Sequence, residues 1–302
     1  MVADSDGKKG LAGCVVLVTG ARGFVGRALI EVLRQQGADI VATTRSEFFP
    51  RGMGIRWQRC NLTDIGAVRA LFAQHRPERV VHLSSQADGR RDLSLVPDTL
   101  QAETVAAVNL LTVATEAGVR RIVLPASLEE PATGEAPVSP YGAAKTATHL
   151  YARMFHRLYA TPVVMARIFM AYGPGQAEWK LIPSTIKRLL TGEAPVIESP
   201  DRVADWVYID DVADALARIL VAPAVDGELV DIGSGTLTSI QDVVTRLAKQ
   251  VAPAVQPRFG AGSARGDALV RTADLAAAER LTGWRPRIGL AEGLSRTIAA
   301  LR

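Results

Sequence analysis

The chain has 302 residues, of which 48% are hydrophobic and 22% are charged. These proportions are ordinary for a globular protein and exclude a fibrous or disordered chain, and the length allows one large domain and a smaller one. The formal net charge is +4 at pH 7, but the basic residues occur as scattered pairs such as Arg90-Arg91 and form no basic block. We therefore expect no nucleic-acid partner and an anionic small molecule as the ligand.

The amino-terminal segment, residues 1–10, is polar and charged and lacks the apolar core of a signal peptide. No apolar run approaches the roughly 18–20 residues that a membrane-spanning helix needs. We expect a cytoplasmic protein without a membrane partner. Cys14 and Cys60 have no metal-type spacing, so we expect two reduced thiols in the core and no metal site.

The first predicted element is an apolar strand over 15–18, followed by the glycine-rich stretch TGARGFVG and a helix over 25–36. Gly20, Gly23 and Gly26 fall on the turn between them. Glycines let a diphosphate approach the backbone, and the free amides and dipole of the following helix attract it. Glycines also collect at ordinary turns, but between a strand and a helix they favour dinucleotide binding.

Short β-rich runs then alternate with helical patterns. The periodicity predicts strands over 39–44, 55–58, 79–84, 121–125 and 163–169, and helices near 64–75, 99–117 and 141–159. This alternation predicts an α/β fold with a doubly wound parallel (Rossmann) sheet and right-handed crossovers. Ligands of such sheets bind at the carboxyl ends of the strands.

The rest of the chain is richer in Pro and Gly and predicts helices near 180–191, 209–221, 239–251, 274–282 and 289–301. We expect a dinucleotide-binding domain over 1–171 and a smaller substrate-binding domain over 172–302. Within the second domain, residues 205–235 are expected to pack back on the first.

The stretch SPYGAAK places Tyr141 and Lys145 four residues apart, on one face of a predicted helix. A phenol beside a fixed ammonium ionises more easily, so Tyr141 is a candidate acid–base. Such pairs are common on helix surfaces. This one opens the helix after the fifth strand, however, and Ser127 ends that strand, so all three residues fall at the carboxyl edge of the sheet beside the glycine turn.

Together, TGARGFVG, YGAAK and Ser127 resemble the short-chain dehydrogenase/reductases. VVHLSSQ, ARIFMAYGPGQ, DWVYIDDVADAL and AERLTGWRPRIGLAEGL are similar to the extended branch of that family, the NAD(P)-dependent sugar epimerases and dehydratases, over nearly the whole chain. The resemblance implies hydride exchange between a nicotinamide and a carbinol or ketone carbon. It implies that Tyr141 is the acid–base, that Lys145 assists it and holds the nicotinamide ribose, and that Ser127 hydrogen-bonds the reacting oxygen.

The end of the second strand bears on the choice of cofactor, because NAD-using relatives place a carboxylate there for the adenosine ribose. This chain has Thr44 followed by Arg45. Arg45 could pair with a 2′-phosphate and Arg22 could close on it from the other side, so we expect NADP(H), with NAD as the alternative. Further cofactor contacts are expected from Gly20, Gly23, Phe24, Val25, Gly26, Asn61, Leu62, Leu83, Ser84, Ser85, Tyr141 and Lys145.

An enzyme adapted to NADPH draws on the reducing pool, which favours net reduction of a ketone. A nucleotide-linked deoxy-sugar is the first candidate substrate, and a non-nucleotide ketone stays open. Dehydration is disfavoured because Ser127 is followed by Leu128 and Glu129 instead of an Asp-Glu pair. The alternatives are an NAD-dependent nucleotide-sugar epimerase and, in another class, a non-catalytic NADP-binding regulator, although such regulators usually lose the Tyr/Lys pair that this chain keeps.

The substrate side departs from the family pattern. Met170, Ala204 and Ala264 stand where nucleotide-sugar enzymes have an asparagine and two arginines that hold the diphosphate. Either Arg202 and Arg265 substitute from neighbouring positions, or the substrate lacks a diphosphate. The expected substrate contacts are Ser85, Ser127, Glu129, Met170, Lys180, Arg202 and Arg265.

The resemblance also implies a homodimer through the helices over 99–117 and 141–159. Leu150, Met154 and Leu158 form an apolar stripe on the second of these helices. Packing within the monomer would explain the stripe equally well.

Overall fold

The computed structural model describes residues 10–47, 54–132, 134–262 and 270–302. Its centre is a seven-stranded sheet in the order β10-β6-β5-β4-β1-β2-β3, in which every neighbouring pair is parallel. The strands are β1 (Val15–Thr19), β2 (Asp39–Thr44), β3 (Arg56–Arg59), β4 (Arg79–His82), β5 (Arg121–Ala126), β6 (Val163–Ile168) and β10 (Leu229–Ile232). The predicted doubly wound parallel Rossmann sheet is confirmed.

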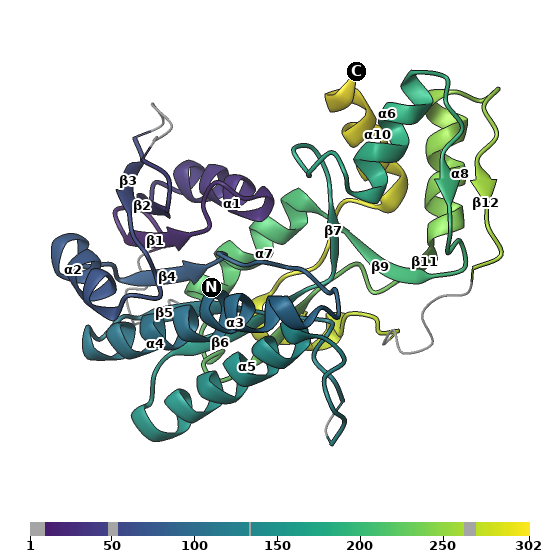
Figure 1. The fold of residues 1–302 in the computed structure, drawn as a ribbon. Coiled ribbons are helices and arrows are strands. Elements are labelled where there is room, and N and C mark those ends of the chain that lie inside the picture. The colour runs from purple at the N-terminus through teal and green to yellow at the C-terminus, as the bar shows by residue number, and fades with distance from the viewer. Residues whose placement is uncertain (1–9, 48–53, 133, 263–269) are drawn as a thin grey trace.

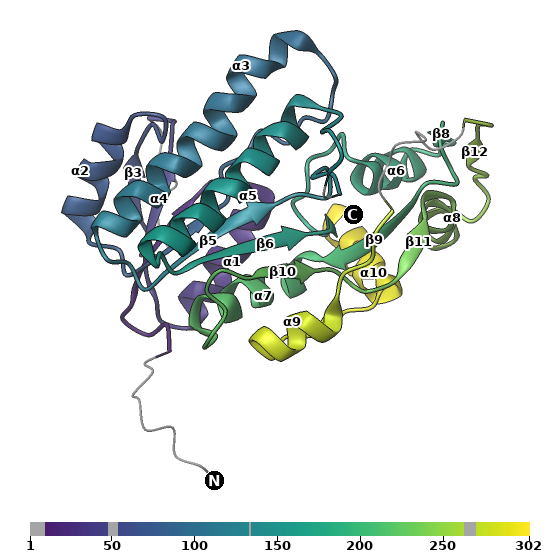
Figure 2. The same cartoon turned by 90° about the horizontal axis from the view of Figure 1, so that it is seen from below.

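Helices cover both faces of this sheet (Figures 1 and 2). One face carries α1 (Phe24–Gln35) and α7 (Ile209–Val221), and the other carries α2 (Ile65–His75), α4 (Ala106–Glu116) and α5 (Pro140–Tyr159). Strand β1 is a continuous apolar run in the sequence because both faces of the sheet are buried. Val16 and Val18 face the α1 side, Leu17 faces the α2 side, and all three are 0% exposed.

The second half of the chain forms a smaller lobe beyond the carboxyl ends of the strands (Figure 1). It has a three-stranded sheet of β7 (Met170–Tyr172), β9 (Val203–Tyr208) and β11 (Leu237–Ser239), and a short parallel pair of β8 (Val196–Ile197) and β12 (Arg258–Phe259). Its helices are α6 (Leu181–Leu190), α8 (Ile240–Val251) and α10 (Leu290–Leu301), whereas α9 (Leu275–Thr282) packs against β10 of the large sheet. The chain also returns to the large sheet from this half, because α7 packs on α1 and β10 pairs with β6.

The long helix expected near 99–117 is more complex than its periodicity suggests. It consists of four consecutive helical segments of different type: η1 (Leu93–Leu95), α3 (Val96–Thr99), a π-helical segment η2 (Leu100–Val105) and α4. A π-helical turn accommodates one extra residue and is often found at functional sites. The acidic residue Glu103 is buried within this π-helical segment.

No helix in the described part of the chain is long and apolar enough to cross a membrane. Cys14 and Cys60 are both buried and unpaired, as expected for two core thiols. Among the described residues, no group of three or more His, Cys, Asp or Glu side chains is placed to hold a metal ion.

Candidate active site

The glycine turn can be formed only by glycine at two positions. Gly20 has φ +65°, and a Cβ added there would lie 2.4 Å from the carbonyl carbon of Leu83, at the end of β4. A Cβ on Gly26 would lie 2.4 Å from the carbonyl oxygen of Gly20. The following helix α1 begins with Gly23 as its N-cap and has no side-chain cap. Its first-turn amides therefore face an open cradle that fits a dinucleotide diphosphate.

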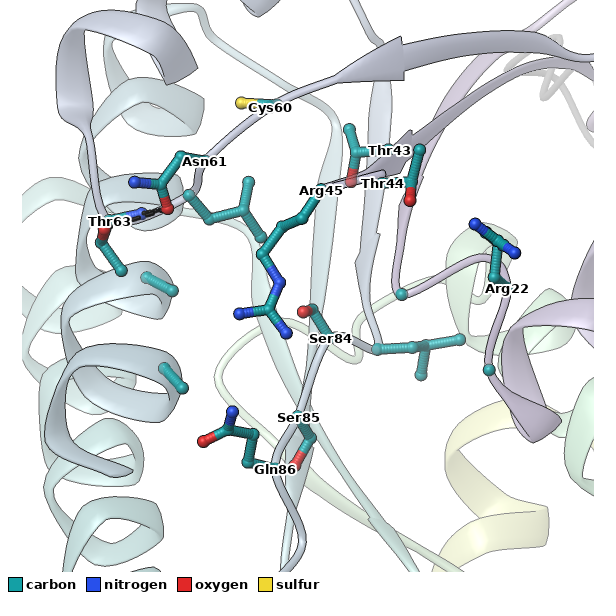
Figure 3. A pocket seen from close by; sticks show the side chains of 16 residues that line it. Arg22, Thr43, Thr44, Arg45, Cys60, Asn61, Thr63, Ser84, Ser85 and Gln86 are labelled. Atoms are coloured by element: carbon teal, nitrogen blue, oxygen red, sulfur yellow. Dashed lines mark hydrogen bonds between the residues drawn. The ribbon is translucent and has the colours of Figure 1, made fainter. Parts of the chain in front are cut away.

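A cavity of about 240 Å³ lies beside this turn, at the carboxyl ends of β1, β2 and β4 (Figure 3). Most of the residues expected to contact the cofactor line it: Gly20, Arg22, Gly23, Thr44, Arg45, Asn61, Leu62, Leu83, Ser84 and Ser85. Phe24, Val25, Gly26, Tyr141 and Lys145 do not line this cavity, and the first two pack against the core. Six further lining residues were not expected: Thr43, Cys60, Thr63, Gln86, Ala102 and Ala106. Ala102 and Ala106 are four residues apart on one helix, a small-residue pair that would have been a usable signal.

The charge of this cavity comes from arginine. Arg22 and Arg45 line it, and no aspartate or glutamate is among the described residues that do so. Figure 3 shows the Arg45 side chain reaching across the pocket toward Ser84, whereas the Arg22 guanidinium lies near Thr44. Glu47, the acidic residue nearest to Arg45 in the sequence, is paired with Arg59 at 2.7 Å. The described wall of the pocket therefore favours an anion.

Cys60 lies in the wall of the same cavity. Burial, and then the nearby charge of Asp64, raise the pKa of its thiol to about 11. The thiol is therefore protonated at neutral pH and is not a nucleophile.

The three expected catalytic residues lie together at the carboxyl end of β5. Helix α5 begins at Pro140, capped by Ser139, and this places Tyr141 in its first turn. One turn later, the Lys145 ammonium lies 5.5 Å from the centre of the Tyr141 ring and 3.3 Å from the carbonyl oxygen of Pro125 in β5. Ser127 directly follows β5. The fold therefore sets a phenol, an ammonium and a hydroxyl at one edge of the sheet.

Ser127 is held by the acidic residues that follow it. Its amide donates to Glu130 Oε1 at 2.6 Å, and its hydroxyl oxygen accepts from the Glu129 amide at 3.1 Å. Glu130 Oε2 lies 2.8 Å from Nδ1 of His149 on α5. The loop is also pressed onto the start of α5, since a Cβ on Gly142 would lie 2.7 Å from the Glu129 carbonyl oxygen. These contacts fix the position of the Ser127 oxygen.

His82, at the end of β4, lies behind these groups and is 1% exposed. Burial, and then the positive charge of Lys145, lower its pKa to about 4, so it is neutral at neutral pH. Its Nδ1 is 2.7 Å from the Thr19 hydroxyl, whose oxygen also accepts from the amides of Leu83 and Ser84. The Thr19 hydroxyl and Nδ1 of His82 therefore share one hydrogen bond, and Thr19 ties the imidazole to the backbone that follows β4.

A second and larger cavity, of about 1350 Å³, lies between the large sheet and the smaller lobe. Of the expected substrate contacts, Glu129, Met170, Lys180 and Arg202 line it. Ser85 lines the smaller cavity, Ser127 lines neither, and Arg265 lies outside the described residues. Gln86 lines both cavities, so the two adjoin there, whereas Tyr141 and Lys145 line neither.

The larger cavity is mixed in character. Its described lining holds both signs of charge: the cations Arg90, Arg91, Lys180, Arg202 and Arg271 and the carboxylates Asp88, Asp98, Glu129, Glu198, Asp201 and Asp205. Arg271 was not predicted, because no recognised motif contains it. Trp179, also in the lining, is 74% exposed and holds the Lys180 ammonium 4.3 Å from its ring. The cavity therefore offers a flat apolar surface at the indole and polar groups of both signs, which suits a polar ligand with a flat or apolar part.

A family model described as the NAD dependent epimerase/dehydratase family matches residues 16–233. Among curated proteins, the chain is 28% identical to a UDP-glucose 4-epimerase of Mycolicibacterium smegmatis, over 95% of this chain and 98% of that one. It is 26% identical to a dTDP-glucose 4,6-dehydratase of Haemophilus influenzae, over 94% and 96% of the two chains.

Solved structures show the same pattern. A structure of MoeE5 in complex with UDP-glucose and NAD is 30% identical, covers 94% of this chain and 97% of that one, and has a TM-score of 0.80. The UDP-glucose 4-epimerase of Thermotoga maritima with UDP-glucose covers 95% and 98% with a TM-score of 0.85, and its 24% identity supports the likeness of fold alone.

Proposed function

Because this chain belongs to the NAD dependent epimerase/dehydratase family, we propose that it is an NADP(H)-dependent ketoreductase acting on a keto group of a nucleotide-linked deoxy-sugar. The observation that carries this proposal is the wall of the smaller cavity, which holds Arg22 and Arg45 and no described carboxylate. A carboxylate at the end of β2 would bind ribose hydroxyls and repel a 2′-phosphate, whereas a guanidinium attracts a phosphate through charge-assisted hydrogen bonds.

A nicotinamide dinucleotide bound at the glycine turn supplies or accepts hydride. The chain itself supplies the proton. In this proposal, Tyr141 donates its phenolic proton to the oxygen of the reduced ketone, and the Lys145 ammonium, 5.5 Å from the centre of the ring, stabilises the phenolate that remains. Ser127 orients that oxygen by donating its hydroxyl proton, while its own hydroxyl oxygen accepts a hydrogen bond from the Glu129 amide.

The expected cofactor preference follows directly from Arg45. We expect wild type to bind NADPH at least about tenfold more tightly than NADH, a difference of about 1.4 kcal/mol, and Arg45→Ala to lose that preference. Titration of both cofactors measures it. Arg246→Ala is the control, because it removes one exposed positive charge on α8 without altering the wall of either cavity. Equal affinities in wild type would contradict the NADP(H) assignment.

Epimerisation is the second candidate reaction, and relatives such as the UDP-glucose 4-epimerase of Mycolicibacterium smegmatis favour it. The two reactions differ in their balance of cofactor. A ketoreductase consumes one NADPH for each nucleotide-linked keto-sugar reduced, whereas an epimerase interconverts two sugar isomers without net consumption. We would follow NADPH absorbance and sugar products together. Isomerisation by protein that retains oxidised NAD, with no loss of NADPH, would replace the ketoreductase by the epimerase.

Two further outcomes bear on the substrate and the class of protein. Reduction of free ketones but not of nucleotide-linked ones would assign the large cavity to a substrate without a diphosphate. Binding of NADP without any turnover would favour a regulatory protein, although such a role gives no reason for the buried Lys145 beside Tyr141.

The outer face of α5 supports a homodimer. Leu150 and Leu158 are 60% and 64% exposed, while Met154 between them packs partly against the core. Two large apolar side chains on one exposed face favour burial against a second copy. We expect a dimer in sedimentation experiments that Leu150→Glu with Leu158→Glu converts to a monomer. A wild-type monomer would end this proposal.

A further inference from the structure

Glu103 is a buried acidic residue that neither the sequence motifs nor the proposed reaction assigns. It lies in the π-helical segment Leu100–Val105, and its side chain is 0% exposed. An ionised carboxylate in such a place is costly unless it is paired and hydrogen-bonded. Its partners therefore indicate what the residue does.

The partners of Glu103 belong to the site. Its Oε2 lies 2.7 Å from the ammonium of Lys145, which is itself only 2% exposed. Its Oε1 accepts from the Ser85 hydroxyl at 2.8 Å and from the Gln86 amide at 2.5 Å. Since Gln86 lines both cavities, one carboxylate joins the lysine beside Tyr141 to the wall that the two cavities share.

The other ionisable groups near this pair do not replace it. Tyr141 is on the same helix as Lys145, and His82 from β4 is neutral because burial and the Lys145 charge lower its pKa to about 4. Glu130, after β5, is occupied by His149. Burial would raise the pKa of Glu103, but the Lys145 charge and the bonds from Gln86 and Ser85 hold it below its usual value. Among the described residues, Glu103 is the one carboxylate in ion-pair contact with Lys145.

We propose that Glu103 is a positioning residue for proton transfer: its carboxylate is the counter-ion that keeps the buried Lys145 charged and directed toward Tyr141. The proposal rests on the role of Tyr141 as proton donor in the proposed function. Burial disfavours an ammonium, and an adjacent carboxylate opposes loss of its proton. Removing the carboxylate should therefore make the buried ammonium easier to deprotonate.

The first test needs neither substrate nor cofactor. Glu103→Gln keeps the size of the side chain and removes its charge, leaving a buried ammonium unpaired. The unfolded chain then binds a proton at this lysine that the folded chain binds weakly, so the stability of the variant relative to wild type rises with pH. The variant should have a lower free energy of unfolding than wild type at pH about 7. Between pH about 7 and pH about 10, we expect this difference to shrink by about 1.4 kcal/mol or more, which is a tenfold change in the folding constant. A deficit that does not change with pH would mean a merely structural role and would overturn the proposal.

The second test uses turnover. Without the opposing carboxylate, the Tyr141–Lys145 pair loses its first proton at lower pH, so the alkaline limb of the rate profile in Glu103→Gln should move down by about one pH unit or more. Glu103→Asp, which keeps the charge, should restore the limb at least in part. If the stability of Glu103→Gln depends on pH but its alkaline limb does not move, the role of Tyr141 as proton donor is wrong and the role of the ion pair stands. The failure of the proposed function is thus distinguishable from the failure of this inference.

Two controls keep the test decisive. Glu116→Gln makes the same chemical change on α4, where the partner Arg69 is exposed, and should show neither effect. If Glu103→Gln does not fold, Glu103→Gln combined with Lys145→Met removes both charges and should restore folding, because only a single unpaired charge is strongly destabilising. If the double variant also fails to fold, an unpaired charge is not the cause, because both charges are gone, and the charge proposal is wrong.

Discussion

Tyr141→Phe is expected to lower the rate of ketone reduction by about 10²–10⁴-fold, the usual contribution of a positioned general acid. The substitution removes only the phenolic oxygen. The ring stays 5.5 Å from the Lys145 ammonium, and the ion pair between that ammonium and Glu103 does not involve it. Cofactor affinity and stability should therefore stay close to those of wild type, so that the loss falls on turnover. Single-turnover kinetics with saturating NADPH measures it.

Tyr151→Phe serves as the matched control, because this tyrosine lies on the same helix and is 43% exposed on its outer side. It should change turnover little. If Tyr141→Phe kept the wild-type rate, the proton would have to come from another group, and the arrangement of Tyr141, Lys145 and Ser127 would no longer support the proposed reaction.

Gly20→Ala is expected to give the largest loss of stability. Any side chain at φ +65° is strained, by about 1–2 kcal/mol. The new Cβ would also lie 2.4 Å from the carbonyl of Leu83 and 2.5 Å from the amide of Ser84. These are backbone atoms that cannot turn aside, so β4 would have to move away from the glycine turn. Overpacking of this kind adds about 1–3 kcal/mol, and it widens the cradle that is expected to hold the diphosphate.

Gly118→Ala isolates the two costs. Gly118 has φ +64°, nearly that of Gly20, but an added Cβ has no atom within 4 Å. Urea unfolding measures the loss of stability in both variants. Both should lose the free energy of backbone strain, and only Gly20→Ala should lose the additional free energy of the steric clash. We expect cofactor affinity to fall at least about tenfold in Gly20→Ala, about 1.4 kcal/mol, and to stay unchanged in Gly118→Ala. Equal losses of stability in the two would show that the close approach of β4 to Gly20 is unimportant.

The helices and main strands could be predicted from the sequence because each depends on local pattern. The prediction of α7 over 209–221 matches the structure, and the others end within a few residues of their predicted bounds. Strand β10 at the edge of the large sheet and the strands of the smaller lobe were missed. Those such as β8 and β12 have two residues each, too few to show a period, and they pair only because the fold brings them together.

The residues of the site also fall into two groups, those placed by local sequence pattern and those placed by tertiary packing. Motif residues such as Gly20 and Arg45 lie in the pocket wall because a strand-to-helix turn and a strand end carry them there whatever the rest of the chain does. Arg271 lines the large cavity only because distant segments meet.

Glu103 shows most clearly what only the tertiary structure decided. In the sequence it lies on the apolar stripe of a helix, four residues before the buried Ala107, and a carboxylate there reads as a break in the pattern. The fold gives it Lys145 from α5, and Ser85 and Gln86 from the segment after β4. The sequence by itself determined the sheet, the glycine cradle and the Tyr141–Lys145 pair, because local periodicity and helical spacing specify them. The counter-ion of that pair, and the meeting of the two cavities beside it, required the packing of three separate segments, and a buried charge is stable only where such packing supplies its partner.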